Sequence, residues 1–305
     1  MQSLIALIAK GMAMGAADVV PGVSGGTIAF ITGIYDRLIN ALKNAPSALK
    51  VLFTEGIKAA WIKMDATFLC AVFGGILISI LSFAHLISYL LATYPVMLWS
   101  FFFGLILVSG FHMLKQVANW NAGNVTILLA GIAVSYAIGL LNPSHISPSL
   151  TVYFVAGAIA ICAMILPGIS GSFILLLMGL YTSVMEAVKS LDLMVLAVFG
   201  SGCLVGLLSF SHVLSWLLKH YRDLTISLLT GLMIGALGKV WPWKQTLETR
   251  INSSGEEVPL VQSNISPFVY EQVMVEPSYL MQSLGLMLVA IVMVLTMEWF
   301  GRKKS

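Results

Sequence analysis

The chain has 305 residues, of which 59% are hydrophobic and only 10% are charged, and its formal net charge is +3. Soluble globular proteins carry about 25% charged residues, so this composition excludes a chain whose whole surface faces water. Asp, Glu, Lys and Arg are absent from the stretches 66–114, 116–185, 193–218 and 277–297. A membrane-spanning helix needs roughly 20 apolar residues, so the sequence predicts an all-α polytopic membrane protein.

The apolar stretches divide into segments that have the same order in each half of the chain. In the first half, helices are predicted over 3–20, 23–40, 66–91, 95–115 and 124–142. In the second half, they are predicted over 150–166, 169–188, 193–218, 223–240 and 279–299. A Pro-Gly dipeptide separates the first two segments of each half, and proline breaks a helix because it lacks the backbone N–H. Each half is therefore predicted to be a broken or re-entrant helical hairpin followed by three transmembrane helices.

Sequence similarity between the halves indicates a duplication. The segments that recur in the same order are 20–26 with 166–172, 33–35 with 179–181, and 83–88 with 210–215. Both ends of a hairpin emerge on one side of the membrane and an odd number of spans follows, so the second half must enter from the opposite side. The chain is therefore predicted to consist of two inverted repeats, 1–142 and 143–305, an arrangement found in many transporters.

The distribution of basic residues predicts the orientation in the membrane. With cytoplasmic N- and C-termini most Lys and Arg lie inside, as the positive-inside rule requires. The basic residues left outside are Lys189, Lys239, Lys244 and Arg250. Two segments then lie beyond the bilayer core, a cytoplasmic one at about 41–64 and a periplasmic loop at about 241–278. The first mixes lysines with apolar residues, which suits either a segment lying flat on the anionic inner surface or an ordinary charged loop.

Both hairpin breaks are followed by small and hydroxyl-bearing residues. The breaks lie at Pro21-Gly22 and at Pro167-Gly168. The residues that follow are Ser24, Gly25, Gly26 and Thr27 in the first half and Ser170, Gly171 and Ser172 in the second. Free N–H groups at a helix start, glycines that admit a ligand and hydroxyl donors together predict a phosphate or carboxylate site. The alternative is a tight turn whose small residues only permit close helix packing.

Two charged residues near the first break are further candidates. Asp18 lies in an otherwise apolar stretch, where a carboxylate is costly and typically functional. It is predicted to bind a coupling proton or sodium ion, and the alternative is a carboxylate that caps nearby backbone. Arg37 lies near the inner surface, where it suits either two-point binding of a lipid phosphate or an anchoring role. Cysteines and histidines are scattered, so no metal site, other cofactor or phosphatase centre is predicted.

The residues around the first break also resemble a known family. The segment 15–27, followed by 33–38, is similar to the signature of the PopT-type polyprenyl-phosphate transporters, a bacterial inner-membrane family long classed as a domain of unknown function. The second hairpin and the rest of the chain resemble this family too. The resemblance singles out Asp18, Pro21, Gly22, Ser24, Gly25, Gly26, Thr27, Tyr35 and Arg37, with Pro167, Gly168, Ser170, Gly171 and Ser172 in the second hairpin.

The resemblance implies a transporter, not an enzyme, in the bacterial cytoplasmic membrane. Such a protein would return undecaprenyl phosphate from the outer to the inner leaflet by alternating access, so that this carrier lipid is reloaded for peptidoglycan and other envelope polymers. The implied partners are the lipid and the membrane and not nucleic acid, and the oligomeric state is left open. The alternative is an ion-coupled transporter of a small soluble anion, which would use the same architecture but ignore an isoprenoid tail.

Overall fold

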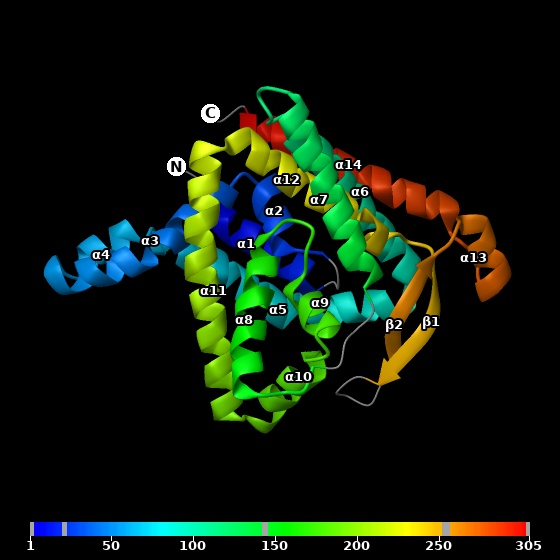
Figure 1. Ribbon diagram of the computed structural model, residues 1–305. Coiled ribbons are helices and arrows are strands. Elements are labelled where there is room, and N and C mark those ends of the chain that lie inside the picture. The colour runs from blue at the N-terminus through cyan, green and yellow to red at the C-terminus, as the bar shows by residue number, and fades with distance from the viewer. Residues whose placement is uncertain (1–2, 20–22, 142–145, 252–256, 303–305) are drawn as a thin grey trace.

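The computed structural model describes residues 3–19, 23–141, 146–251 and 257–302 of a helical protein (Figure 1). The helices of the first half are α1 (Leu4–Val19), α2 (Gly25–Ile31), α3 (Tyr35–Thr54), α4 (Ile57–Lys63), α5 (Ala66–Thr93), α6 (Pro95–Leu114) and α7 (Ala122–Leu140). Those of the second half are α8 (Leu150–Ile165), α9 (Gly171–Leu177), α10 (Tyr181–Ser190), α11 (Leu193–His220), α12 (Arg222–Gly235), the 3-10 helix η1 (Ala236–Val240), α13 (Pro267–Met274) and α14 (Leu280–Arg302).

Several of these helices have the length and composition of membrane spans. They are α5, α6, α7, α11 and α12 continued by η1. The pair α9 and α10 is apolar enough for one further span but is bent by 111°. Large apolar side chains such as Leu81, Leu204 and Leu288 are exposed along α5, α11 and α14, as expected for faces in contact with lipid. The prediction of an all-α polytopic membrane protein is confirmed.

The second arm of each hairpin differs from the prediction. The segments predicted as single helices over 23–40 and 169–188 are each divided, into α2 and α3 and into α9 and α10. The divisions contain Gly33 with φ +68° and Gly179 with φ +71°, in the left-handed region that favours glycine and ends a helix. The repeated Gly-x-Tyr sequence at 33–35 and 179–181 is therefore a second break in each hairpin.

The two halves pack in the same manner at equivalent positions. Helix α1 packs against α5 in the first half, and the equivalent pair in the second half is α8 with α11. Two further equivalent pairs join the halves, α6 with α14 and α12 with α7. A Cβ at Gly104 in α6 would collide with the backbone of α14, and one at Gly231 in α12 would collide with the backbone of α7. Tyr94 and Tyr221 join the two long helices of each half with nearly identical backbone angles, φ/ψ of −134°/51° and −133°/49°. The opposite insertion of the halves into a bilayer stays a prediction.

The two segments predicted to lie beyond the bilayer core have structure of their own. The C-terminal part of α3 and helix α4 form an arm that projects away from the other helices, whereas the first turns of α3 are buried (Figure 1). Its exposed apolar residues include Phe53, Ile57 and Trp61, interspersed with lysines. The region 241–278 was predicted as a loop, but it contains the antiparallel strands β1 (Lys244–Ile251) and β2 (Glu257–Asn264) before α13. Contact of the arm with a membrane surface stays a prediction.

Candidate functional site

The two hairpins contact each other directly at their breaks. Ser24 is the residue before α2. Its hydroxyl donates to the carbonyl oxygens of Met164 and Leu166, which lie 3.0 Å and 3.2 Å from Ser24 Oγ. The Tyr35 hydroxyl donates to the carbonyl of Ile165 over 3.2 Å. Side chains of the first hairpin therefore bind the backbone at the C-terminal end of α8.

This contact follows from the helix break in the second hairpin. The last carbonyls of a helix have no partner within it, and a buried carbonyl without a partner costs about 1–3 kcal/mol. Pro167 ends α8 and supplies no N–H of its own. The N–H of the next residue, Gly168, donates to Thr27 Oγ1 over 3.1 Å. Ser24, Thr27 and Tyr35 thus satisfy polar groups that the break in the other hairpin exposes.

The first two N–H groups of α2 are hydrogen-bonded within the first hairpin. The Gly25 N–H donates to Asp18 Oδ1 over 2.7 Å, and the Gly26 N–H donates to Ser24 Oγ over 3.1 Å. Ser24 and Thr27 have no exposed surface. The N–H groups of Gly25 and Gly26, which were predicted to bind an anion, are therefore occupied in this conformation by acceptors of the first hairpin itself.

Asp18 lies where a carboxylate that caps the start of α2 is expected to lie. Its carboxylate binds the first N–H of α2 from the end of α1, across the break. Pro21 and Gly22, the predicted break itself, lie outside the described residues. In the second hairpin the predicted break is seen, with Pro167 buried and Gly168 at φ +86°. A role of Asp18 in coupling stays a prediction.

The second hairpin is more open than the first. Ser170 Oγ and Ser172 Oγ lie 2.8 Å apart, with Ser170 buried and Ser172 exposed. A cavity of about 10 Å³ adjoins Ser170, and Ser135, Gly168, Phe173 and Lys239 also line it. This volume is enough for about one water molecule. Of the two serines predicted for the second hairpin, Ser172 is therefore exposed, and the buried Ser170 lies beside a small cavity.

Arg37 has a carboxylate partner in this structure. Its Nε lies 2.6 Å from Asp65 Oδ2 and its Nη2 lies 3.0 Å from Asp65 Oδ1, while the guanidinium covers the Phe68 ring at 4.3 Å. The neighbouring Asp36 pairs with Arg222 of the second half over 3.0 Å. An exposed ion pair is worth about 0–1 kcal/mol, so Arg37 can exchange Asp65 for another anion at little cost. Binding of a lipid phosphate by Arg37 stays a prediction.

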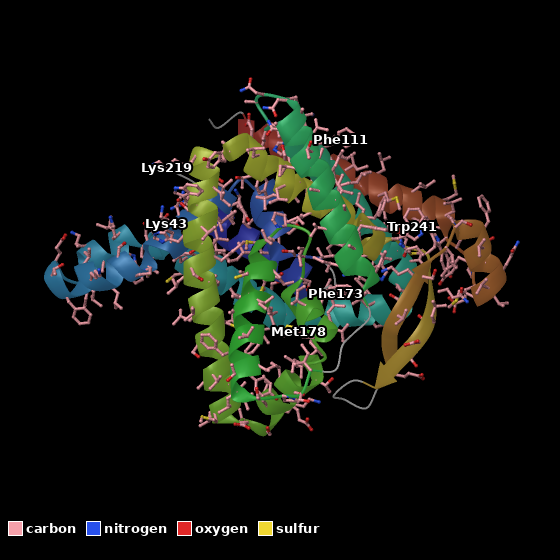
Figure 2. All side chains as sticks on the ribbon, viewed as in Figure 1. Lys43, Phe111, Phe173, Met178, Lys219 and Trp241 are labelled. Carbon is pink, nitrogen blue, oxygen red and sulfur yellow. The ribbon has the colours of Figure 1, made fainter. Side chains whose placement is uncertain are left out.

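Sequence reasoning missed Lys239, which the structure places beside the second hairpin. It lies in η1, and its Nζ is 2.7 Å from the centre of the ring of Phe173. Phe173 is a residue of α9 and is labelled in Figure 2. The Lys244 ammonium donates to the Lys239 carbonyl and covers the Trp99 ring at 4.3 Å. Burial lowers the pKa of Lys244 to about 8. A lysine at the end of the apolar segment 223–240 was the signal available in the sequence.

The bond between Thr27 and Gly168 gives a test of the hairpin contact. Replacing Thr27 with valine keeps the shape but leaves the buried Gly168 N–H without an acceptor, so the free energy of unfolding is expected to fall by about 1–3 kcal/mol. Denaturant unfolding of the purified protein in detergent measures the change. Thr126→Val is the matched control, because the Thr126 hydroxyl is exposed and bonds only its own helix. Equal stability of the two variants would contradict the role given to Thr27.

Comparisons with known proteins identify related sequences. Residues 14–258 match a family model described as undecaprenyl phosphate translocase-like. The chain is 55% identical over 295 residues to the polyprenyl-phosphate transporter of Vibrio cholerae, covering 96% of each chain. It is 35% identical over 254 residues to the polyprenyl-phosphate transporter of Staphylococcus aureus, covering 77% of this chain and 85% of the relative. No solved structure matches the chain.

Proposed function

The chain belongs to the undecaprenyl phosphate translocase-like family, and we propose that it moves undecaprenyl phosphate from the outer to the inner leaflet of the bacterial cytoplasmic membrane. Its relatives are named as transporters, which supports translocation of the lipid rather than its chemical conversion. The observation that carries the site proposal is the direct contact between two broken hairpins, whose polar groups lie in an otherwise apolar chain.

The chemistry of the lipid explains why such a contact is useful. Undecaprenyl phosphate joins a charged phosphate to a long hydrocarbon tail, and only the phosphate is costly to move through hydrocarbon. The tail can stay in lipid along the exposed apolar faces of the helices. The protein then has to supply a polar route for the headgroup alone. Ser24–Thr27 and Ser170–Ser172 are the groups proposed to form it.

Alternating access would proceed by exchange of hydrogen bonds at the hairpin contact. When the hairpins separate, the Ser24 hydroxyl and the Gly168 N–H lose their partners and become donors for the phosphate. Each such bond contributes only about 0.5–1.5 kcal/mol net, so a charged acceptor that replaces the lost partner offsets the cost of opening. The conformation described here is then the closed state between the two open ones.

Asp18 and Arg37 have separate roles in this proposal. A bare carboxylate near the phosphate would repel it, so Asp18 is proposed to hold a proton or a sodium ion while the phosphate is bound. The substrate then moves together with the ion, which supplies the coupling. Arg37 is proposed to receive the headgroup at the inner surface by exchanging Asp65 for phosphate. With cytoplasmic termini, the released carrier lipid is available for the synthesis of peptidoglycan and other envelope polymers.

A transport assay in reconstituted vesicles tests the function. In vesicles that contain the protein, labelled undecaprenyl phosphate is expected to move between leaflets. The corresponding alcohol, which lacks the phosphate, is expected not to be moved by the protein. Rates should depend on the length of the isoprenoid tail, because the tail lies against the protein surface. Protein-dependent uptake of a soluble phosphate compound, with no movement of the lipid, would instead favour a transporter of small anions and overturn the proposal.

A further inference from the structure

The Lys239 ammonium has an unusual environment for a half-buried cation. It lies against the face of the Phe173 ring and beside the cavity at the second hairpin. Within the described residues, no carboxylate forms an ion pair with it. A cation withdrawn from water is normally paired with an anion, and a ring face replaces that partner only in part. The position therefore suits an anion that is not part of the chain.

The groups around Lys239 are those that bind a phosphate monoester. Ser170 lines the cavity from the second hairpin and Ser135 lines it from α7, and each of these residues carries a hydroxyl. Ser172, exposed and 2.8 Å from Ser170, extends the set outward. Lysine binds phosphate as a point charge on a flexible stem, which lets the ammonium move between two partners.

On the basis of the proposed function, we propose that Lys239 binds the phosphate of polyprenyl phosphate at the second hairpin. While the site is empty, the Lys239 ammonium stays against the Phe173 ring. When the phosphate binds, the ammonium moves from the ring to the phosphate. A cavity of about 10 Å³ has room for a water molecule and not for a phosphate, so the site widens when Lys239 leaves the ring.

A difference between the repeats supports a site at one hairpin. The residue equivalent to Phe173 in the first hairpin is Thr27, which accepts the Gly168 N–H. At this position the first hairpin therefore has Thr27, which bonds the second hairpin, whereas the second hairpin has Phe173, which contacts Lys239. The phosphate is bound mainly by the second hairpin, and the first hairpin positions it.

Binding measured on purified variants tests the proposal. The probes are polyprenyl phosphate, polyprenol of the same chain length and inorganic phosphate. Lys239→Gln is expected to weaken binding of polyprenyl phosphate by about ten- to hundredfold, with no change for polyprenol, since one charge-assisted contact is lost. Lys239→Arg should restore part of the affinity. Lys219→Gln is the control, because Lys219 is exposed at the end of α11 (Figure 2). Equal affinity of Lys239→Gln and wild type would overturn the proposal.

A second measurement uses the unmodified protein and does not depend on how the variants fold. Amine-directed acetylation, read by mass spectrometry, should modify Lys239 more slowly with polyprenyl phosphate than with polyprenol, while Lys219 reacts equally in both. Unchanged reactivity of Lys239, in a protein that does transport the lipid, would overturn the role of Lys239 and leave the proposed function standing. Protection by inorganic phosphate but not by polyprenyl phosphate would likewise overturn the proposal that Lys239 binds the headgroup of the lipid.

Discussion

Replacing Gly26 with leucine is expected to abolish transport and to lower the free energy of unfolding by about 3 kcal/mol. A Cβ at this position would lie 2.5 Å from the carbonyl oxygen of Ile165 and 3.1 Å from Ser24 Oγ. Overpacking in a buried site typically costs about 1–3 kcal/mol, and the shift would also break the bonds of Ser24 and Tyr35 to α8. Denaturant unfolding in detergent and lipid movement in vesicles measure the two effects.

Gly74→Leu provides the matched control for this substitution. Gly74 lies in α5, and a Cβ there would meet no other atom within 4 Å. The same increase in size is therefore expected to leave stability and transport close to those of wild type. If Gly26→Leu unfolds and transports like Gly74→Leu, the hairpins do not need the close approach that the structure shows.

Apolar patterning accounts for most of the fold that could be predicted. Long runs without charge define α5, α6 and α11 with little ambiguity, because a membrane helix must bond its own backbone and expose apolar side chains. The sheet of β1 and β2 was not predicted, since the region 241–278 alternates polar and apolar residues only over short runs. Strand pairing depends on a partner segment, which composition does not reveal.

The candidate site was predictable as a location but not as a set of bonds. Pro-Gly in each hairpin marks a helix break, and a break leaves backbone groups in need of partners. The sequence could not show that Ser24 and Tyr35 of one hairpin supply partners for the other. Lys239 was missed for a related reason, because it reaches the second hairpin from η1, which is distant in sequence.

The closed first hairpin changes how the repeated motif is interpreted. The motifs of both hairpins were predicted to contribute to one phosphate site, but the N–H groups of Gly25 and Gly26 already have acceptors. The polar groups of the first hairpin bond one another and the end of α8, whereas Ser170 of the second hairpin lines a cavity together with Lys239. The repeated motif therefore has different surroundings in the two hairpins.

Asp18→Asn is expected to fold normally but to transport about 5- to 150-fold more slowly, which corresponds to a rise of about 1–3 kcal/mol in the transport barrier. In the wild type the Gly25 N–H donates to Asp18 Oδ1 over 2.7 Å. The side-chain oxygen of asparagine can accept the same bond, so the cap at the start of α2 is kept. The amide cannot take up a proton and binds a sodium ion far less well than a carboxylate does. Transport in vesicles with an imposed proton or sodium gradient measures the loss.

Asp18→Leu separates the two interpretations of this carboxylate. Leucine removes the acceptor as well as the charge, so the Gly25 N–H is left without a partner at a cost of about 1–3 kcal/mol. A carboxylate that only caps α2 predicts that the leucine variant is defective and the asparagine variant is not. A carboxylate that carries the coupling ion predicts that both variants lose the response to the gradient, although only leucine loses stability. Wild-type transport and an intact gradient response in Asp18→Asn would leave Asp18 with the capping role alone, and the driving ion would then have to bind elsewhere.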